Sequence, residues 1–170
     1  MSKPFSPTRH KNLVLALDPG YERLGIAVLE ATADGKQKLL HSECFRTKAT
    51  LPFTERLLRI GLRVEELLHT HQPEKFALEK LFFSTNRKTA MRVAEVRGTL
   101  LYIAARNKLR IYEYTPAEVK IAVTGYGKSD KRQIMEMLPR LIHIEKSAKL
   151  DDEFDAIAIG ITCLVSERSG

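Results

Sequence analysis

The chain has 170 residues, of which 44% are hydrophobic and 29% charged, and its formal net charge at pH 7 is +7. This composition fits one globular domain able to bury a core, and no apolar run approaches the roughly 20 residues that a membrane helix needs. Two cysteines, Cys44 and Cys163, without a CxxC pair or a histidine cluster, argue against a disulfide framework and a zinc site and favour a reducing cytoplasm. In chain order, residues 1–12 predict a disordered basic tail, which is followed by one domain at 13–170.

The first half of this domain predicts a hairpin-rich sheet and one helix. Apolar runs at 13–18 and 24–30, separated by Pro-Gly, predict two strands of a hairpin, and residues 37–46 predict a third strand. Residues 53–72 carry apolar side chains at helical spacing, and Pro73 closes that helix.

The second half alternates strands and helices. The predicted elements are a buried strand at 75–79, a helix at 88–107, a strand at 110–114, a helix that opens with the capping box Thr115-Pro116-Ala117-Glu118, a short helix that begins at Ser129 or Asp130, and a largely apolar final helix in "LDDEFDAIAIGITCLVSE". Three antiparallel strands followed by alternating helices and strands predict an α/β fold: a mixed five-stranded sheet with helices on both faces. This order resembles the RNase H-like superfamily.

Acidic residues stand at the ends of the apolar segments. Asp18 closes the first strand and Glu79 the fourth, and functional sites in open α/β sheets gather at the carboxyl ends of strands. Asp152 and Asp155 are three residues apart and share one face of the final helix. Close carboxylates repel unless a cation neutralises them, and oxygen-only ligands favour Mg²⁺ or Mn²⁺. Because two such ions can drive phosphodiester hydrolysis, these four acids are the predicted metal ligands and catalytic residues.

A purely structural explanation of the helix acids stays open. Acids in a first helical turn are stabilised by the helix dipole by about 0.3–1 kcal/mol each, and Asp151 or Asp152 can serve as the N-cap. Asp155 is harder to explain in this way, because the apolar stretch "AIAIGI" after it predicts a helix buried from its first turn. Asp151 beside Asp152 leaves the register of the third ligand open.

The basic excess is concentrated in one stretch. From Lys80 to Arg110 there are eight Lys or Arg against one acid, Glu95. A solvated helix face would explain such a run, but together with a carboxylate cluster it favours a metal-dependent nuclease.

Five motifs together resemble the RuvC family of Holliday junction resolvases. They are "LALDPGYERLGIAV", "FALEKLFFSTN", "AEVRG", "TPAEVKIAVTGYGKSDK" and "LDDEFDAIAIG", and they cover the chain from about Leu13 to Ser166 in the family's order. The resemblance implies a homodimer that nicks two opposed strands of four-way junction DNA and leaves 5′-phosphate ends. It also implies two Mg²⁺ ions per subunit, held at the positions of Asp18, Glu79, Asp152 and Asp155, with Mn²⁺ able to substitute. A branch-migration motor of the RuvA/RuvB kind is a further partner that the resemblance suggests and the sequence leaves open.

The predicted DNA contacts lie in two regions. They are Phe82, Phe83, Asn86, Arg87, Lys120, Lys128, Lys131 and Arg132. Phe82 matches the family's aromatic that stacks on a base near the junction centre, and Phe83 could share that role. Lys120 and Lys131 match basic residues near the scissile phosphate. The others open the long helix or flank a glycine-rich turn, where backbone amides and basic side chains suit phosphate.

The long helix carries a departure from the family. The family usually has Gly-Gln-Ala-Arg-Gly where this chain has "AEVRG", so Glu95 adds a charge whose effect is open. In the family this helix supplies much of the dimer interface. Ala90, Ala94 and Gly98 would permit close packing there, although an intrachain contact explains them equally well.

Three other functions compete with this prediction. A related YqgF-type nuclease would act on RNA or on other branched nucleic acid. Sugar kinases and actin-like ATPases have a phosphate-binding hairpin similar to "DPGYERLGIAV", but they need two such domains. A non-catalytic junction-binding protein would lack a carboxylate, and none of the four is missing.

Overall fold

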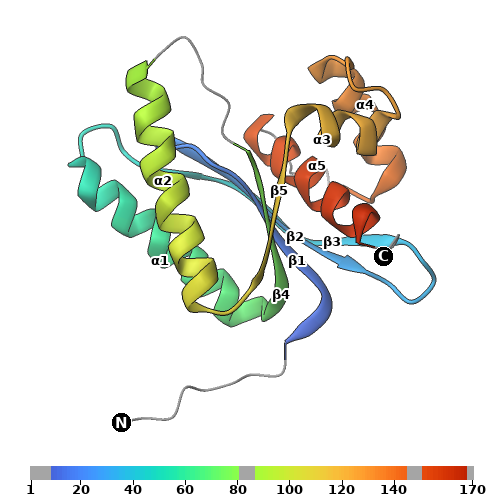
Figure 1. The fold of residues 1–170 in the computed structure, drawn as a ribbon, viewed down its shortest axis with the longest axis horizontal. Helices are drawn as coiled ribbons and strands as arrows, with labels where there is room; N and C mark the ends of the chain where they lie inside the picture. The colour runs from blue at the N-terminus through green and yellow to red at the C-terminus, as the bar shows by residue number, and fades with distance from the viewer. Residues whose placement is uncertain (1–8, 81–86, 145–150, 168–170) are drawn as a thin grey trace.

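The computed structural model describes residues 9–80, 87–144 and 151–167 (Figure 1). Its elements are β1 (His10–Asp18), β2 (Arg23–Ala31), β3 (Gln37–Arg46), α1 (Phe53–His71), β4 (Pro73–Glu79), α2 (Arg87–Arg106), β5 (Arg110–Tyr114), α3 (Pro116–Thr124), α4 (Lys131–Leu141) and α5 (Asp151–Ser166). Every strand and helix predicted from the sequence is present, within a few residues of its predicted bounds. No helix in the described ranges has the length and apolar character to span a bilayer.

The five strands form one mixed sheet in the order β3-β2-β1-β4-β5. The two hairpin connections make β1–β2 and β2–β3 antiparallel, whereas the crossovers through α1 and α2 make β1–β4 and β4–β5 parallel. Because β4 enters the sheet beside β1 in the same direction, the carboxyl ends of these two strands lie at the same edge. The mixed five-stranded sheet is therefore confirmed.

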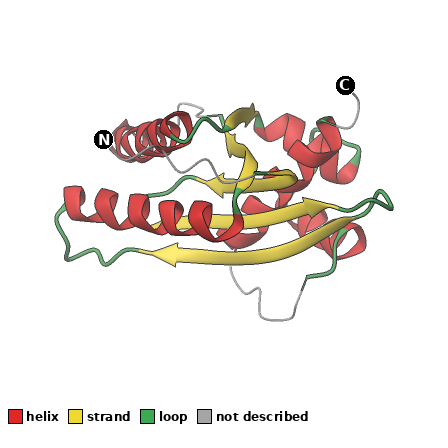
Figure 2. Cartoon of the chain, turned by 90° about the horizontal axis from the view of Figure 1, so that it is seen from below, coloured by secondary structure: helices red, strands yellow, loops and turns green. Residues whose placement is uncertain are grey.

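Helices cover both faces of the sheet (Figures 1 and 2). Leu15, Leu17 and Phe76 point into a core shared with α1 and α2. Val14 and Ala16 point to the opposite face, into a core shared with α3, α4 and α5. Since side chains alternate along a strand, Asp18 lies on the same face as Val14 and Ala16. The strand thus places its terminal carboxylate on the α5 side of the sheet.

Local sequence signals account for the helix starts. Thr115 and Glu118 form the predicted capping box of α3. A second capping box opens α4. The Asp130 side chain accepts a hydrogen bond from the Gln133 N–H, and the Gln133 side chain accepts one from the Asp130 N–H. Of the two predicted starts, Ser129 and Asp130, the N-cap is therefore Asp130. Each box satisfies backbone N–H groups that a helix start leaves without partners.

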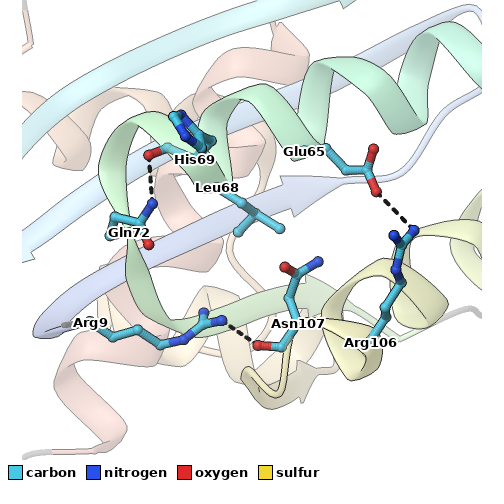
Figure 3. A pocket seen from close by; sticks show the side chains of 7 residues that line it. All are labelled: Arg9, Glu65, Leu68, His69, Gln72, Arg106 and Asn107. Atoms are coloured by element: carbon cyan, nitrogen blue, oxygen red, sulfur yellow. Dashed lines mark hydrogen bonds and ion pairs between the residues drawn. The ribbon is translucent and has the colours of Figure 1, made fainter. Parts of the chain in front are cut away.

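The predicted tail boundary at residue 12 is wrong, because residues 10–12 belong to β1. The His10 N–H donates to the Gln72 carbonyl at 3.0 Å, and the Arg9 guanidinium donates to the Pro73 carbonyl at 3.0 Å. The same guanidinium also donates to the carbonyl oxygen of Asn107 (Figure 3). Arg9 also lines a cleft of about 300 Å³ near the ends of α1 and α2, at the opposite end of β1 from Asp18. The side chains of His10, Lys11 and Asn12 are polar and exposed, so the sequence shows no apolar strand pattern at these positions. Residues 1–8 lie outside the described residues.

Candidate active site

Three residues form a row across the sheet at its acidic edge. Asp18 on β1 pairs in register with Gly25 on β2, and Gly25 pairs with Cys44 on β3. On the other side of β1, Leu17 pairs with Leu78, so Glu79 ends β4 beside Asp18. Strand pairing alone therefore brings the first two predicted ligands together, although 61 positions separate Asp18 from Glu79 in the sequence.

The first turn of α5 sits directly over Gly25. A Cβ atom added to Gly25 would overlap the carbonyl oxygen of Asp152 and would lie 2.7 Å from its carbonyl carbon and 3.1 Å from the Asp18 Cβ. Glycine is therefore required here for the close approach of two backbones. The absent side chain lets Asp152 reach the edge where Asp18 lies.

Side chains on β3 also contact this turn. The Cys44 thiol donates to the Asp152 carboxylate with an Sγ–Oδ2 distance of 3.7 Å, and Ser42 Oγ donates to the carboxylate of Glu153. Glu153 is buried, and its carboxylate contacts β3 through this hydrogen bond with Ser42. Ser42, Cys44 and Glu153 were missed by sequence reasoning. The alternation along β3, which gives Ser42 and Cys44 the same face, was the only available signal.

The carboxylates raise one another's proton affinity. Burial, and then the charges of Asp155, Glu79 and Asp152, raise the pKa of Asp18 to about 7. The pKa of Glu79 is raised by burial and by the charge of Asp155, and burial also raises that of Asp155. A site in which one acid is half-protonated near neutral pH is one that a cation would stabilise.

The two adjacent acids that open α5 differ in exposure and in contacts. Asp151 is exposed and pairs with Lys131 at 3.5 Å, whereas Asp152 is half-buried and adds its charge to the field at Asp18. This arrangement favours Asp152 over Asp151 as the third member of the cluster. Within the described ranges, no three His, Cys, Asp or Glu side chains are gathered closely enough to hold a metal ion as they stand.

Basic residues approach the acids from two sides. Lys131 Nζ donates to Asp155 Oδ2 at 3.0 Å, and Arg23 pairs with Asp152 at 3.5 Å. Lys120 and Lys131 line a cleft of about 230 Å³ together with Glu79 and Asp155. The charge of Lys120 partly offsets the rise in the pKa of Glu79. Two of the predicted DNA contacts therefore lie beside the carboxylates.

The other predicted DNA contacts have no contact with the four carboxylates among the described residues. Lys128 lies in the turn before α4, and Arg132 is exposed and pairs with Glu136 at 3.4 Å. Arg87 opens α2, but its side chain is not described. Phe82, Phe83 and Asn86 lie outside the described residues.

Arg97 links α2 to the end of β4. Its guanidinium donates to the Glu79 carbonyl at 3.3 Å and forms an ion pair with Glu113 on β5. Arg97 also lines a second cleft, of about 210 Å³, with Asp18 and Glu79. The "AEVRG" motif thus holds the backbone that carries Glu79. Glu95 of the same motif pairs with Arg92 on the surface of α2 at 3.1 Å.

The raised pKa of Asp18 predicts a pH-dependent stability. The pKa is 3.8 for the ordinary side chain and about 7 in the folded chain, so between these values the folded state keeps a proton that the unfolded state has lost. The corresponding stabilisation is full below about pH 4 and is lost as the pH rises to about 7. We expect Asp18→Asn, which cannot ionise, to melt at a higher temperature than the parent in EDTA at about pH 8, with the gap closing toward about pH 4. A difference in melting temperature between the two proteins that stays the same at every pH in this range would contradict the raised pKa of Asp18.

The fold and the site define a class, namely RNase H-like α/β proteins with an acidic cluster at the carboxyl ends of central strands. The family model "Crossover junction endodeoxyribonuclease RuvC" matches residues 14–163. The chain therefore belongs to the RuvC family.

Individual relatives agree with this assignment. RuvC from Desulfitobacterium hafniense is 40% identical over 149 residues, which is 88% of this chain and 90% of the relative. RuvC from Alkaliphilus metalliredigens is 38% identical with the same coverage. Thermus thermophilus RuvC, solved in complex with a Holliday junction substrate, superposes with a TM-score of 0.85 at 31% identity over 94% of this chain and 97% of that chain. The yeast mitochondrial resolvase Ydc2, at 16% identity and a TM-score of 0.69, shares the fold.

Proposed function

We propose that this chain is a structure-selective endonuclease that resolves four-way DNA junctions. The carrying observation is the acidic cluster of Asp18, Glu79, Asp152 and Asp155 at one sheet edge, in a chain of the RuvC family. The relative solved with a Holliday junction substrate matches nearly the whole chain, and that relative binds the substrate class proposed for this one. The net charge of +7 suits a polyanionic substrate.

The donor chemistry of the four carboxylates suits divalent cations, although their described side chains must draw closer together to hold one. All are hard oxygen donors, which Mg²⁺ and Mn²⁺ prefer, and burial together with the charges of Asp155, Glu79 and Asp152 raises the pKa of Asp18 to about 7. We infer that Asp18, Glu79, Asp152 and Asp155 hold two Mg²⁺ ions. When bound, such ions polarise the phosphodiester and lower the pKa of a water molecule that can attack it.

The chain's own residues then orient the substrate. Lys131 donates a hydrogen bond to Asp155, so its ammonium group is held in the cleft that Glu79 and Asp155 also line, where a scissile phosphate would lie. Lys120 lines the same cleft and adds a second positive charge. Rigid placement of these groups lowers the entropy cost of aligning a phosphate with the acids. We propose that cleavage leaves a 5′-phosphate and a 3′-hydroxyl that a ligase can rejoin.

The outer face of α2 is proposed as the homodimer interface. Met91 is 67% exposed and Tyr102 is 65% exposed, the highest values among the large apolar side chains of the described residues, and both lie on this one helix. A Cβ added to Gly98, which lies between them, would meet no described atom within 4 Å, so an intrachain contact does not account for this glycine. Helical spacing places Met91, Ala94, Gly98 and Tyr102 in one stripe, which we call the α2 stripe.

We expect Tyr102→Glu to convert a dimer into a monomer, because an unpaired charge would be buried within the α2 stripe. The measurement is molar mass by light scattering after size exclusion. Leu40→Glu on β3, also exposed, is the matched control and should remain dimeric. A dimer of unchanged mass for Tyr102→Glu, with an unchanged melting temperature, would exclude this surface.

The function is tested by Mg²⁺-dependent cleavage of a synthetic four-way junction. We expect paired nicks on opposed strands and little cleavage of a linear duplex of equal length. A structured RNA serves as the third substrate. Preferential cleavage of the RNA would overturn the proposal in favour of a YqgF-type nuclease, and junction binding without cleavage would favour a binding protein.

A further inference from the structure

The turn between α3 and α4 holds one aromatic residue by its backbone and leaves its ring exposed. The Tyr126 N–H donates to Thr124 Oγ1 at 3.2 Å. The Tyr126 carbonyl accepts from the Ser129 N–H at 3.2 Å and from the Ser129 hydroxyl at 2.8 Å. Ser129 is itself buried, whereas Tyr126 is 59% exposed. The backbone is therefore fixed while much of the ring faces solvent.

Neighbouring residues stiffen the same turn. Gly125 has a φ of 77°, a conformation that glycine adopts without strain, and its N–H closes α3 by donating to the Ile121 carbonyl. A Cβ on Gly127 would approach the Ile121 side chain to 3.3 Å, so the turn lies close against α3. Thr124 and Ser129 also join their hydroxyl groups at 2.6 Å. An exposed ring on a rigid support loses little conformational entropy when it binds a ligand.

The turn lies beside the candidate active site. Lys131, five residues after Tyr126, reaches Asp155, and Lys120 on α3 lines the same cleft. Lys128 belongs to the turn itself. The turn that carries Tyr126 is thus flanked by Lys120 and Lys131 of the acidic cleft and contains Lys128. Basic groups beside an exposed ring favour a polyanion that offers planar groups, and a nucleic-acid strand has both properties.

We propose that Tyr126 stacks on a nucleobase of the DNA strand whose phosphate lies at the acidic cluster. Lys128 and Lys131 hold the flanking phosphates, and the phenol ring lies against the face of an unstacked base. The contact selects substrates in which a base near the scissile phosphate is free to leave the duplex stack, as at a branch point. This inference rests on the proposed function and adds to it a residue that distinguishes an unstacked base from a stacked one.

The chain contains no tryptophan, which allows a direct optical test. Tyr126→Trp introduces one indole at the turn, and we expect its emission to fall strongly when a four-way junction is added in EDTA, because stacking on a base quenches it. Leu141→Trp is the control, since Leu141 is exposed at the far end of α4 from Lys131. Its emission should change little. Binding of the junction to the Tyr126→Trp variant without quenching of the introduced indole would overturn the proposal.

Affinity gives a second measurement that needs no cleavage. We expect Tyr126→Ala to weaken junction binding in EDTA by about 5- to 150-fold, since one base–aromatic stack has that effect, and Tyr126→Phe to restore it. Leu62→Ala removes exposed apolar surface from α1, on the opposite face of the sheet, without removing a ring and should bind like the parent. Equal affinity of Tyr126→Ala and parent would refute the stacking role. Failure of the parent itself to bind junctions would instead refute the proposed function.

Discussion

Replacing Asp18 with asparagine is expected to abolish nicking of a four-way junction while leaving junction binding close to that of the parent chain. Asp18 adjoins Glu79 on the neighbouring strand and lies under the first turn of α5. Asparagine keeps the shape but removes the charge on which a divalent cation depends, so the loss of rate should be about 10³-fold or more. The measurement compares single-turnover cleavage in Mg²⁺ with gel-shift affinity in EDTA.

Asp151→Asn is the matched control for this change. Asp151 is exposed and pairs with Lys131, and it lies one residue from Asp152 on the same turn. We expect Asp151→Asn to cleave at a rate close to that of the parent. Cleavage by Asp18→Asn at the parent's rate would exclude the two-metal assignment, and loss of cleavage in Asp151→Asn would move the third ligand to Asp151.

Gly25→Ala is expected to reduce both stability and cleavage, although it adds a single methyl group. The new Cβ would overlap the Asp152 carbonyl oxygen, and the atom that it meets is backbone, which no side-chain rotation can move aside. Overpacking of this kind costs about 1–3 kcal/mol in the free energy of unfolding. Since α5 must move away from β2, Asp152 moves away from Asp18, and a displacement of about 1 Å can cost about 100-fold in rate.

Gly61→Ala provides the control for a glycine substitution as such. Gly61 lies within α1, and a Cβ there would sit at 3.4 Å from the Ile103 Cδ1 atom, an ordinary contact. We expect Gly61→Ala to be as stable as the parent or more so, because alanine favours helix over glycine by about 1 kcal/mol. Denaturant unfolding and single-turnover cleavage report the two effects. A Gly25→Ala variant with parental stability and rate would show that α5 does not depend on this close approach.

Much of the fold followed from local chemistry. Capping residues such as Thr115 and Glu118 act within a few positions, and the strand β1 is apolar on both faces because helices cover both. The carboxylates at strand ends and on one helix face could likewise be predicted, since strand polarity and helical spacing are short-range properties. The N-terminal boundary was mispredicted because His10 to Asn12 join the sheet through backbone hydrogen bonds that leave no hydrophobic signal.

The sequence by itself thus determined which acids end the strands, which helix carries the other two, and that the chain is strongly basic. Only the tertiary structure decided what surrounds them. It places Gly25 under Asp152, turns Glu153 toward Ser42 and brings Lys131 onto Asp155. These contacts join residues from 24 to 127 positions apart. They form only when β1, β2 and β3 are paired in register and α5 is packed on the sheet. No local pattern encodes a contact of that kind, because its energy depends on the packing of both elements at once.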